Sequence, residues 1–471
     1  MRGRSSGETT CWHDADGRTL LAGSSRVLRG RARDARSPGG LAASSRVLQG
    51  RARDARSPRR VGGIVARVAG AGAGRPLSPL VGGIVARGAG RRLTSTALRA
   101  RLPPRMEDDH AAMRRALELA RLGLHSVSPN PMVGCVIARG STVIGEGFHR
   151  RAGEPHAEVE ALSACREDPA GATVYVSLEP CAHTGRTPPC AEALVNARVA
   201  RVVIATRDPN TLVDGQGIER LRAAGIAVEA GLLEEEARRL NEVFLHSVRT
   251  RLPFVVLKGG MSLDGKLATI NRESRWITST ESRQRNFLLR EEHDAILVGS
   301  GTVVTDDPEL TRRLGLNTSI TPWIRAIVDS RGKIPASSTL LADDRPTVLF
   351  TTRPERYEGA KNTEVIASVS DGEGRIDLLE VLRALYERGV RSVIVEGGSA
   401  LHTDVIRRRL WQKMILFIAP VLLGGESAPA LYSPSGGVSR LTDAPRFRFD
   451  SVERSGNDLV VTAYPDQETA I

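Results

Sequence analysis

The two segments that decide the fold are His156-Ala157-Glu158 and Glu179-Pro180-Cys181-Ala182-His183-Thr184-Gly185-Arg186-Thr187-Pro188-Pro189-Cys190. One imidazole and two thiolates can hold a zinc ion and leave its fourth tetrahedral position open for water. A carboxylate two residues after the histidine is placed to carry protons to and from that water. The sequence therefore predicts His156, Cys181 and Cys190 as zinc ligands and Glu158 as the catalytic proton carrier.

This division of roles is typical of zinc deaminases, in which the glutamate is an acid and base and not a ligand. Cys181 and Cys190 are nine residues apart instead of the usual three. The spacing alone therefore also fits two structural cysteines beside an unrelated histidine. Both segments are expected at helix N-termini, where the helix dipole favours thiolate over thiol. Cys135 lies in an apolar run and is expected in the core.

The charge of the chain is concentrated at one end. The net charge is +13, but residues 1–105 hold 22 arginines, no lysine and five acids, whereas the remainder has 45 basic and 49 acidic residues. The body of the protein is thus mildly acidic, as in an ordinary enzyme, and no nucleic-acid partner is expected. Five cysteines indicate a reducing compartment, and no apolar run is long enough to span a membrane. We therefore expect a cytoplasmic protein.

Residues 1–105 form a low-complexity, arginine-rich segment that repeats with a period of 20: the stretch 21–38 recurs at 41–58, and 61–67 recurs at 81–87. Its small residues, Gly, Pro and Arg offer too little apolar surface to offset the entropy of ordering. Three interpretations stay open. The segment is an upstream extension of the reading frame with the start at Met106, an organelle transit segment, or a disordered basic arm for an acidic partner.

Strand and helix patterns alternate from Met106 to about Thr250. Asp108 or Asp109 can cap a helix through Ala120, and strands are expected over 132–138, 141–148 and 173–178. A single helix over 234–248 is expected to lead to the next half. This alternation predicts a three-layer α/β/α sandwich for residues 106–250.

A second domain is expected over residues 251–471, with buried strands at 254–258, 295–299 and 392–396. The last strand enters Gly397-Gly398 and a helix. A double glycine there offers free backbone N–H groups to phosphate oxygens, although it is also common as a tight turn. Glu396, at the end of that strand, is a candidate ligand for a sugar hydroxyl. Asp306 and Asp307 are expected on a loop or, equally, at a solvated helix start.

Together, Ser128-Pro129-Asn130-Pro131-Met132-Val133-Gly134, His156-Ala157-Glu158 and the segment from Pro180 to Cys190 resemble the bifunctional deaminase/reductase family of riboflavin biosynthesis. The nine-residue cysteine spacing is that family's own pattern. The resemblance implies an α/β protein with a cytidine-deaminase-like domain that binds Zn²⁺ and a dihydrofolate-reductase-like domain that uses NADPH. It also implies a homo-oligomer acting on a small phosphorylated pyrimidine.

The resemblance further implies which residues form the two sites. In the deaminase domain, the pyrimidine and phosphate would contact Asn130, His183 and Arg186. In the reductase domain, NADPH would contact Met261, Trp276, Thr278, Thr302, Asp306, Ser330 and the turn Gly398-Ser399-Ala400-Leu401-His402-Thr403-Asp404. The ribosyl phosphate would contact Ser274, Arg290, Leu310, Arg313 and Glu396. The planar fork of arginine suits a phosphate because it binds two oxygens at once.

The function that the resemblance implies has two steps. Hydrolytic deamination of 2,5-diamino-6-(5-phosphoribosylamino)pyrimidin-4(3H)-one would be followed by reduction of its ribosyl group to ribityl with NADPH. One alternative is a zinc-dependent nucleic-acid or nucleotide base deaminase guided by the basic N-terminal segment, which leaves the C-terminal domain without a catalytic role. Another is a chain in which one half has lost activity and serves as a scaffold.

Overall fold

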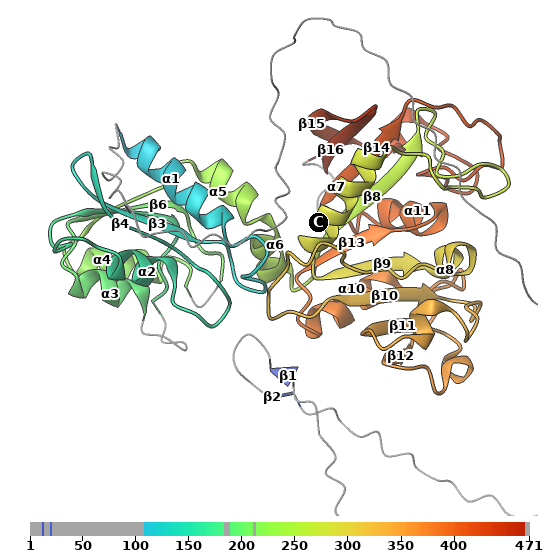
Figure 1. The fold of residues 1–471 in the computed structure, drawn as a ribbon, viewed down its shortest axis with the longest axis horizontal. Helices are drawn as coiled ribbons and strands as arrows, with labels where there is room; N and C mark the ends of the chain where they lie inside the picture. Colours follow the sequence, from blue (N-terminus) through green and yellow to red (C-terminus); the bar gives the residue numbers. More distant parts are fainter. Residues whose placement is uncertain (1–11, 14–18, 21–107, 183–188, 211–212, 467–471) are drawn as a thin grey trace, which may run out of the picture. The chain divides into compact units, whose positions relative to one another are not determined.

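The structure is a computed structural model that describes residues 12–13, 19–20, 108–182, 189–210 and 213–466. The expected segment 1–105 therefore lies outside the described residues, apart from an antiparallel pair of two-residue strands, β1 (Trp12–His13) and β2 (Thr19–Leu20). The rest of the described chain forms two larger sheets covered by helices (Figure 1). No helix among the described residues is long and apolar enough to cross a membrane.

The first of these sheets has five strands in the order β4-β3-β5-β6-β7. The strands are β3 (Gly134–Arg139), β4 (Thr142–Phe148), β5 (Thr173–Leu178), β6 (Arg201–Thr206) and β7 (Ala227–Ala230). β3 is antiparallel to both β4 and β5, whereas β5, β6 and β7 are parallel. The expected strand at 173–178 is confirmed at both ends.

Helices cover both faces of the five-stranded sheet (Figure 1). They are α1 (Asp109–Arg121), α2 (Ala157–Ser163), α3 (Cys190–Asn196), α4 (Gln216–Ala223) and α5 (Glu234–Leu240). α1 and α5 pack on one face and α2, α3 and α4 on the other, each against its own apolar cluster. The Asp108 carboxylate caps α1 by accepting from the N–H of Ala111 at 2.7 Å, as the sequence predicts. The three-layer α/β/α prediction is confirmed.

The prediction of a single helix over 234–248 is wrong. The chain forms α5 and then α6 (Glu242–Thr250), with Asn241 between them in a non-helical conformation, φ −106° and ψ 23°. Asn241 uses its side chain elsewhere: its amide nitrogen donates to the carbonyl of Met132 and its carbonyl accepts from the Met132 N–H, both at 2.8 Å. This contact joins residues 109 positions apart, so no local pattern could reveal it.

The second sheet has nine strands in the order β12-β11-β10-β9-β13-β8-β14-β16-β15. They are β8 (Phe254–Ser262), β9 (Ala295–Gly299), β10 (Ile324–Asp329), β11 (Thr347–Thr351), β12 (Thr363–Ala367), β13 (Ser392–Glu396), β14 (Lys413–Ala419), β15 (Phe447–Ser455) and β16 (Asp458–Pro465). The seven strands from β12 to β14 are parallel, and β16 and β15 continue the sheet antiparallel. The expected strands at 295–299 and 392–396 are confirmed.

Helices also cover both faces of this sheet. They are α7 (Thr280–Glu291), α8 (Ser300–Asp306), α9 (Thr339–Ala342), α10 (Leu378–Glu387) and α11 (Ser399–Arg407), with short 3-10 turns at Pro354–Tyr357 and Leu441–Asp443. α10 and α11 pack on one face, and α7, α8 and α9 on the other. The sequence placed Asp306 outside the body of a helix, but it is the last residue of α8. Only Asp307 lies beyond the helix.

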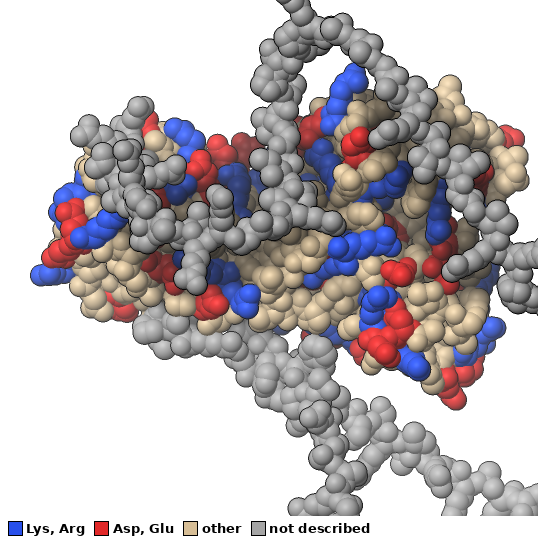
Figure 2. Space-filling model, viewed as in Figure 1, with Lys and Arg blue, Asp and Glu red and all other residues tan. Residues whose placement is uncertain are grey.

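The fold places functional segments at the carboxyl ends of the parallel strands, where open α/β sheets bind ligands. β5 delivers Glu179 and Cys181, while β13 and β9 deliver Glu396 and the starts of α11 and α8. On the face shown in Figure 2, basic and acidic side chains of the described residues lie interspersed. This mixed surface agrees with the near balance of 45 basic and 49 acidic residues beyond residue 105.

Candidate active sites

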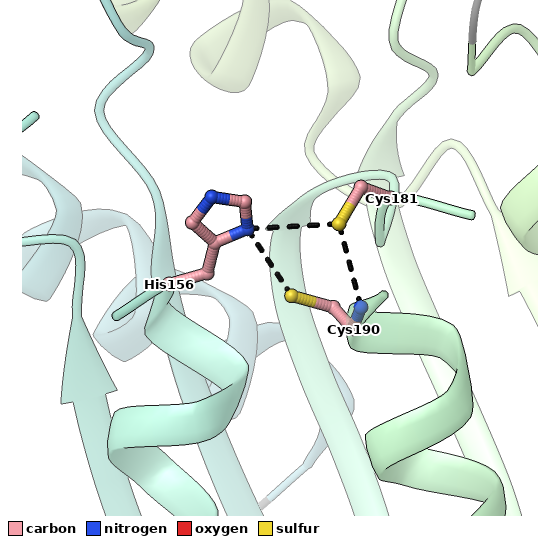
Figure 3. A group of neighbouring side chains, drawn as sticks. All are labelled: His156, Cys181 and Cys190. Atoms are coloured by element: carbon pink, nitrogen blue, oxygen red, sulfur yellow. Dashed lines mark hydrogen bonds between the residues drawn. The ribbon is translucent and has the colours of Figure 1, made fainter. Parts of the chain in front are cut away.

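The three predicted zinc ligands lie together beside two helix N-termini (Figure 3). His156 is the N-cap residue of α2, Cys190 is the first residue of α3, and Cys181 follows the end of β5. One ligand atom from each residue lies within 4.8 Å of the other two. Cys135 is fully buried in β3 and is not part of this group, as expected.

The distances within this group fit a tetrahedral zinc ion. His156 Nδ1 lies 3.2 Å from Cys190 Sγ and 3.6 Å from Cys181 Sγ. With about 2.3 Å to sulfur and about 2.0 Å to nitrogen, zinc would hold these atoms about 3.6 Å apart. Zinc would therefore need little movement of the side chains.

The electrostatics of the two thiols favour cation binding. The Cys190 thiol and the His156 ring donate hydrogen bonds that hold the pKa of Cys181 well below its ordinary value, and the N–H of Cys190 adds a third at 3.3 Å. The same interaction with Cys181, together with burial, raises the pKa of Cys190. Metal ligation needs deprotonated thiols, so a bound cation would displace any proton that the two sulfurs share.

Glu158 lies in the first turn of α2, next to the metal-ligand group. Its side chain is buried, and burial raises the pKa of its carboxyl group. The carboxylate is within hydrogen-bonding reach of the Cys190 thiol. The predicted proton carrier and the predicted zinc ligands are therefore brought together.

Asn130 is also brought to this site. Its amide nitrogen lies 3.0 Å from His149 Nε2, and the His149 ring packs edge-on against the His156 ring at 5.5 Å. The other two residues expected to contact the substrate here, His183 and Arg186, lie outside the described residues.

A second group of charged side chains lies where the last residue of β13, Glu396, pairs with Lys258 in the middle of β8. Arg290 of α7 binds Glu396 through two contacts, 2.9 and 3.0 Å, and Lys258 Nζ lies 3.8 Å from the same carboxylate. Asn286 also donates to Glu396, at 3.4 Å. The Phe287 ring lies 6.0 Å from the Arg290 guanidinium and 5.0 Å from the Arg313 guanidinium. Three predicted substrate contacts, Arg290, Arg313 and Glu396, are thus neighbours.

Leu310 and Ser274, the other predicted substrate contacts, lie on loops. Leu310 is buried, with a positive φ of 50°, and its carbonyl accepts from the indole of Trp323 at 2.8 Å. Ser274 is half-buried, and its carbonyl accepts from Ile277 at 3.2 Å. The structure describes no contact between either residue and the charged group around Glu396, so their roles stay predictions.

Several of the residues expected to contact NADPH line the same edge of the sheet. Met261 lies near the end of β8, Thr302 in α8 and Ser330 just beyond β10. Trp276 and Thr278 lie on the loop before α7, where the guanidinium of Arg283 covers the exposed Trp276 ring at 4.6 Å. Arg275 ties this loop to α8, because it donates to the Asp306 carbonyl at 2.7 Å.

The expected turn from Gly398 to Asp404 is mostly helix α11. Gly398 is its N-cap, Ser399 is half-buried and Ala400 exposed in its first turn, and Leu401, His402, Thr403 and Asp404 are buried. Thr403 accepts from the N–H of Ser433, and Asp404 binds the guanidinium groups of Arg407 and Arg408, both at 3.1 Å. Direct cofactor contacts by these inner residues stay predictions.

Two family models match this chain. Residues 106–206 match the cytidine and deoxycytidylate deaminase zinc-binding region, and residues 253–461 match the RibD C-terminal domain. The riboflavin biosynthesis protein RibD of Bacillus amyloliquefaciens is 41% identical over 359 residues, which is 75% of this chain and 95% of that protein. RibD of Escherichia coli is 40% identical, over 75% of this chain and 98% of that protein. The chain belongs to the RibD family.

Solved structures show the same relationship. A RibD structure from Acinetobacter baumannii superposes with a TM-score of 0.67 and 37% identity, covering 76% of this chain and 99% of that one. A deaminase/reductase from Thermotoga maritima gives 0.67 and 36%, covering 76% of this chain and 98% of that one. This RibD-family chain is a bifunctional enzyme of the riboflavin pathway. It combines a cytidine-deaminase-like and a dihydrofolate-reductase-like domain, and its cofactors are Zn²⁺ and NADPH.

The reductase edge has room for the cofactor of a RibD-family protein. A side chain added at Gly301 or Gly398 would meet nothing within 4 Å, so the starts of α8 and α11 are open. No side chain caps α11, which leaves its first N–H groups free to bind phosphate oxygens. The hydroxyl of Thr302 lies 3.5 Å from the position of a Cβ on Gly397, so the two segments are adjacent.

Sequence reasoning missed the role of Glu179, which supports the RibD-type zinc site. Glu179 accepts hydrogen bonds from the N–H groups of Asp208, Gly215, Gly217 and Ile218, at 3.1 to 3.4 Å. It thereby ties the segment that carries Cys181 to the start of α4. An acid two residues before a ligand cysteine was a signal available in the sequence, but its four partners come from 29 to 39 residues away.

Proposed function

We propose that residues 106–250 form a domain that deaminates 2,5-diamino-6-(5-phosphoribosylamino)pyrimidin-4(3H)-one. Residues 251–471 then form a domain that reduces the ribosyl group of the product to ribityl. The observation that carries the first assignment is the group His156, Cys181 and Cys190 with Glu158 beside it. The charged group around Glu396 and the open start of α11 support the second.

In the deaminase domain, His156, Cys181 and Cys190 hold the metal through one nitrogen and two sulfurs. Bound zinc supplies Lewis acidity that lets water attack the amino-bearing carbon at neutral pH. Glu158 accepts the proton of the attacking water and passes it to the departing amine. Its burial keeps that proton from exchanging with bulk solvent.

Asn130 holds the pyrimidine, and His149 orients the Asn130 side chain. The His149 Nδ1 lies 3.1 Å from the carbonyl of Pro155, so this nitrogen carries the proton and Nε2 accepts from the Asn130 amide nitrogen. Burial lowers the pKa of His149, which favours this neutral form. The Asn130 carbonyl is then left to accept a hydrogen bond from the substrate. His183 and Arg186 are proposed to complete the pyrimidine and phosphate site.

In the reductase domain, NADPH supplies the hydride. Arg290 and Arg313 are proposed to bind the substrate phosphate, while Glu396 holds Arg290 and faces the sugar hydroxyls, with Ser274 and Leu310 lining the same substrate site. Lys258, Arg290 and Glu396 carry a net positive charge, which suits a phosphate monoester. Met261, Trp276, Thr278, Thr302, Asp306 and Ser330 are proposed to line the cofactor path, together with the N-terminal turn of α11 from Gly398 to Leu401.

The test is to supply the purified, zinc-loaded chain with the diaminopyrimidine substrate and to follow two signals. Ammonia should be released without NADPH, and NADPH should be oxidised only after deamination. Ammonia release without later NADPH oxidation would indicate a chain whose C-terminal half is a scaffold. NADPH oxidation without ammonia release would contradict the proposed order.

We also propose that the chain is a cytoplasmic homo-oligomer. β15 is an edge strand of the nine-stranded sheet, and Phe447, Phe449 and Val452 on it are 40%, 66% and 58% exposed. An exposed apolar edge strand favours pairing with a second copy. Phe449→Asp should therefore lower the molar mass measured by light scattering. The thiols of Cys135 and Cys165 are free, which suits a reducing compartment.

A further inference from the structure

A buried carboxylate at the end of α7 holds the loop that carries Arg313. Glu291 is the last residue of α7, and its side chain is fully buried. Its Oε1 accepts from the N–H of Leu314 at 2.8 Å. Its Oε2 accepts from the N–H groups of Leu316 and Asn317, at 3.1 and 3.0 Å. One side chain therefore fixes the backbone that follows Arg313.

The carbonyl groups around the end of α7 bind the same loop. The last carbonyls of a helix have no partner within the helix and need donors from elsewhere. The side-chain amide of Asn317 donates to the Glu291 carbonyl at 2.6 Å. Arg312 donates to the Arg290 carbonyl at 3.0 Å and also to the His293 carbonyl. The loop thus completes the hydrogen bonds of the helix end, while Glu291 completes those of the loop.

The segment before Arg313 is held as well. The indole of Trp323 donates to the Leu310 carbonyl at 2.8 Å. The buried Arg325 donates to the Glu309 carbonyl at 3.3 Å. Leu310 has a positive φ of 50°, a conformation that is unfavourable for a residue with a side chain and persists where the surroundings hold it. The backbone is therefore fixed on both sides of Arg313.

This backbone determines where the Arg313 guanidinium lies. The Arg313 side chain and its ion-pair partner Glu309, 3.8 Å away, are 51% and 52% exposed, and exposed pairs contribute little. The Arg313 guanidinium lies 5.0 Å from the Phe287 ring, and that of Arg290 lies 6.0 Å from the same ring. Arg290 also donates to the Thr311 carbonyl at 3.3 Å, so the loop contacts the second arginine directly.

Glu291 holds the loop as a charged group. Burial would raise the pKa of its carboxyl group, but the three loop N–H groups and the Arg312 guanidinium outweigh burial and hold that pKa below its ordinary value. A carboxylate accepts from several donors at once, whereas a neutral amide of the same size turns a donor toward them. Glu291→Gln is therefore a small change that opposes the contact.

We infer that Glu291 is a positioning residue of the reductase, which holds Arg313 beside Arg290 and thereby sets the affinity for the phosphate group of the substrate. The inference rests on the proposed binding of that phosphate by the two arginines. Because its side chain is fully buried, Glu291 acts through the loop and not by touching the substrate. Phosphate binding by guanidinium groups depends on their geometry, so a loosened Arg313 should cost affinity.

The test is steady-state NADPH oxidation by the zinc-loaded full chain with the deaminated substrate. Glu291→Gln should raise the KM for this substrate about tenfold, the size expected when a hydrogen bond to a charged group is lost. Its kcat and its KM for NADPH should change less than about twofold, because phosphate binding is equal in the ground state and the transition state. An unchanged KM for the substrate would overturn the inference.

The same substrate without its phosphate separates positioning from a general loss of structure. Glu291→Gln should change kcat/KM for the phosphate-free substrate less than about twofold, so its preference for the phosphorylated substrate should fall about tenfold. Equal losses with both substrates would show a structural defect and would overturn the inference.

Arg313→Ala tests the link between Glu291 and the phosphate. It should raise the KM for the phosphorylated substrate, and adding Glu291→Gln should raise it little further, because both changes act on one contact. Full additivity in the double variant would overturn the role of Glu291 alone. No effect of Arg313→Ala would overturn the phosphate assignment of the proposed function, and the inference with it.

Glu292→Gln is the matched control, because it makes the same chemical change on the residue that caps the end of α7. Within the part of the chain that the structure describes, the loop N–H groups donate to Glu291 and not to Glu292. This variant should keep the kcat and both KM values of the parent. A rise in its substrate KM equal to that of Glu291→Gln would overturn the inference.

Discussion

The Arg290 guanidinium faces the Glu396 carboxylate through two parallel contacts, 2.9 Å from Nε to Oε1 and 3.0 Å from Nη2 to Oε2. Lys258 lies 3.8 Å from the same carboxylate, and all three side chains are less than 20% exposed. Burial disfavours the charged form of Glu396, but Arg290 and Lys258 outweigh it and lower its pKa to about 2. One carboxylate therefore balances two buried cations, and the excess positive charge is available to an anionic substrate.

Glu396→Ala should destabilise the reductase domain, because it leaves Arg290 and Lys258 buried without a counter-ion. Removing one partner of a buried pair typically costs about 3–5 kcal/mol of unfolding free energy. Urea unfolding followed by fluorescence measures this loss. NADPH oxidation should also fall, whereas ammonia release by the other domain should persist.

The matched control for this prediction is Glu380→Ala. Glu380 pairs with Arg383 on α10, but both side chains are more than half exposed. Exposed pairs contribute about 0–1 kcal/mol, so this variant should unfold almost as the parent does. Equal destabilisation by the two variants would contradict the buried-pair account of Glu396.

Glu158→Gln should stop deamination without removing the metal. The amide keeps the size of the side chain but cannot carry the proton, and loss of a positioned acid and base lowers the rate about 10²–10⁴-fold. Zinc content measured by mass spectrometry should stay at the parent level, and NADPH oxidation with the pre-deaminated substrate should be unchanged. Loss of zinc from this variant would place Glu158 among the ligands instead.

Cys181→Ser should lose both zinc and ammonia release, because it removes one of the two thiolates that the site offers to zinc. Chelator treatment of the parent should have the same effect and should be reversed by added zinc. Cys165→Ser is the control, since its thiol donates to the Ala161 carbonyl at 3.4 Å and lies outside the metal-ligand group. That variant should keep its zinc.

The elements that the sequence predicted well are those with local signals. The strands at 173–178, 295–299 and 392–396 were correct to the residue because short apolar runs end there at polar or glycine residues. The zinc group was found because the ligand types and their chain order are distinctive. The helix cap at Asp108 was likewise a local signal.

The features that sequence reasoning missed depend on contacts between distant segments. The break at Asn241 follows from its bonds to Met132. The position of Lys258 beside Glu396 follows from the register of β8 and β13, which no local pattern sets. His149 acquires its role only when folding brings it to Asn130, 19 residues away. Such contacts become visible only when both partners have been placed.

Gly217→Ala should disturb the zinc site from outside it. A Cβ at this position would lie 1.9 Å from the carbonyl oxygen of Pro180, next to Cys181, so α4 or the ligand segment must move. Overpacking of this kind costs about 1–3 kcal/mol, and we expect lower stability together with slower ammonia release. Gly372→Ala is the control, because its Cβ would meet nothing within 4 Å. Normal zinc content and activity in Gly217→Ala would contradict the close packing.

Mild acid should destabilise the reductase domain through His402 in α11. This side chain is 1% exposed, and burial lowers its pKa to about 4. In the unfolded chain its pKa returns to about 6.5, so between these values the unfolded state binds a proton that the folded state does not. The stability that neutral His402 contributes is therefore complete above about pH 6.5 and is lost as the pH falls towards about 4.

A shift of this size corresponds to about 3 kcal/mol at most. His402→Leu keeps an apolar side chain in the same place and removes the titration. Its unfolding free energy, measured in urea at about pH 7 and about pH 5, should fall less than that of the parent. Part of the fall should remain, because burial also lowers the pKa of His246 to about 4. Parallel losses in the parent and in His402→Leu would show that His402 is not a source of the acid sensitivity.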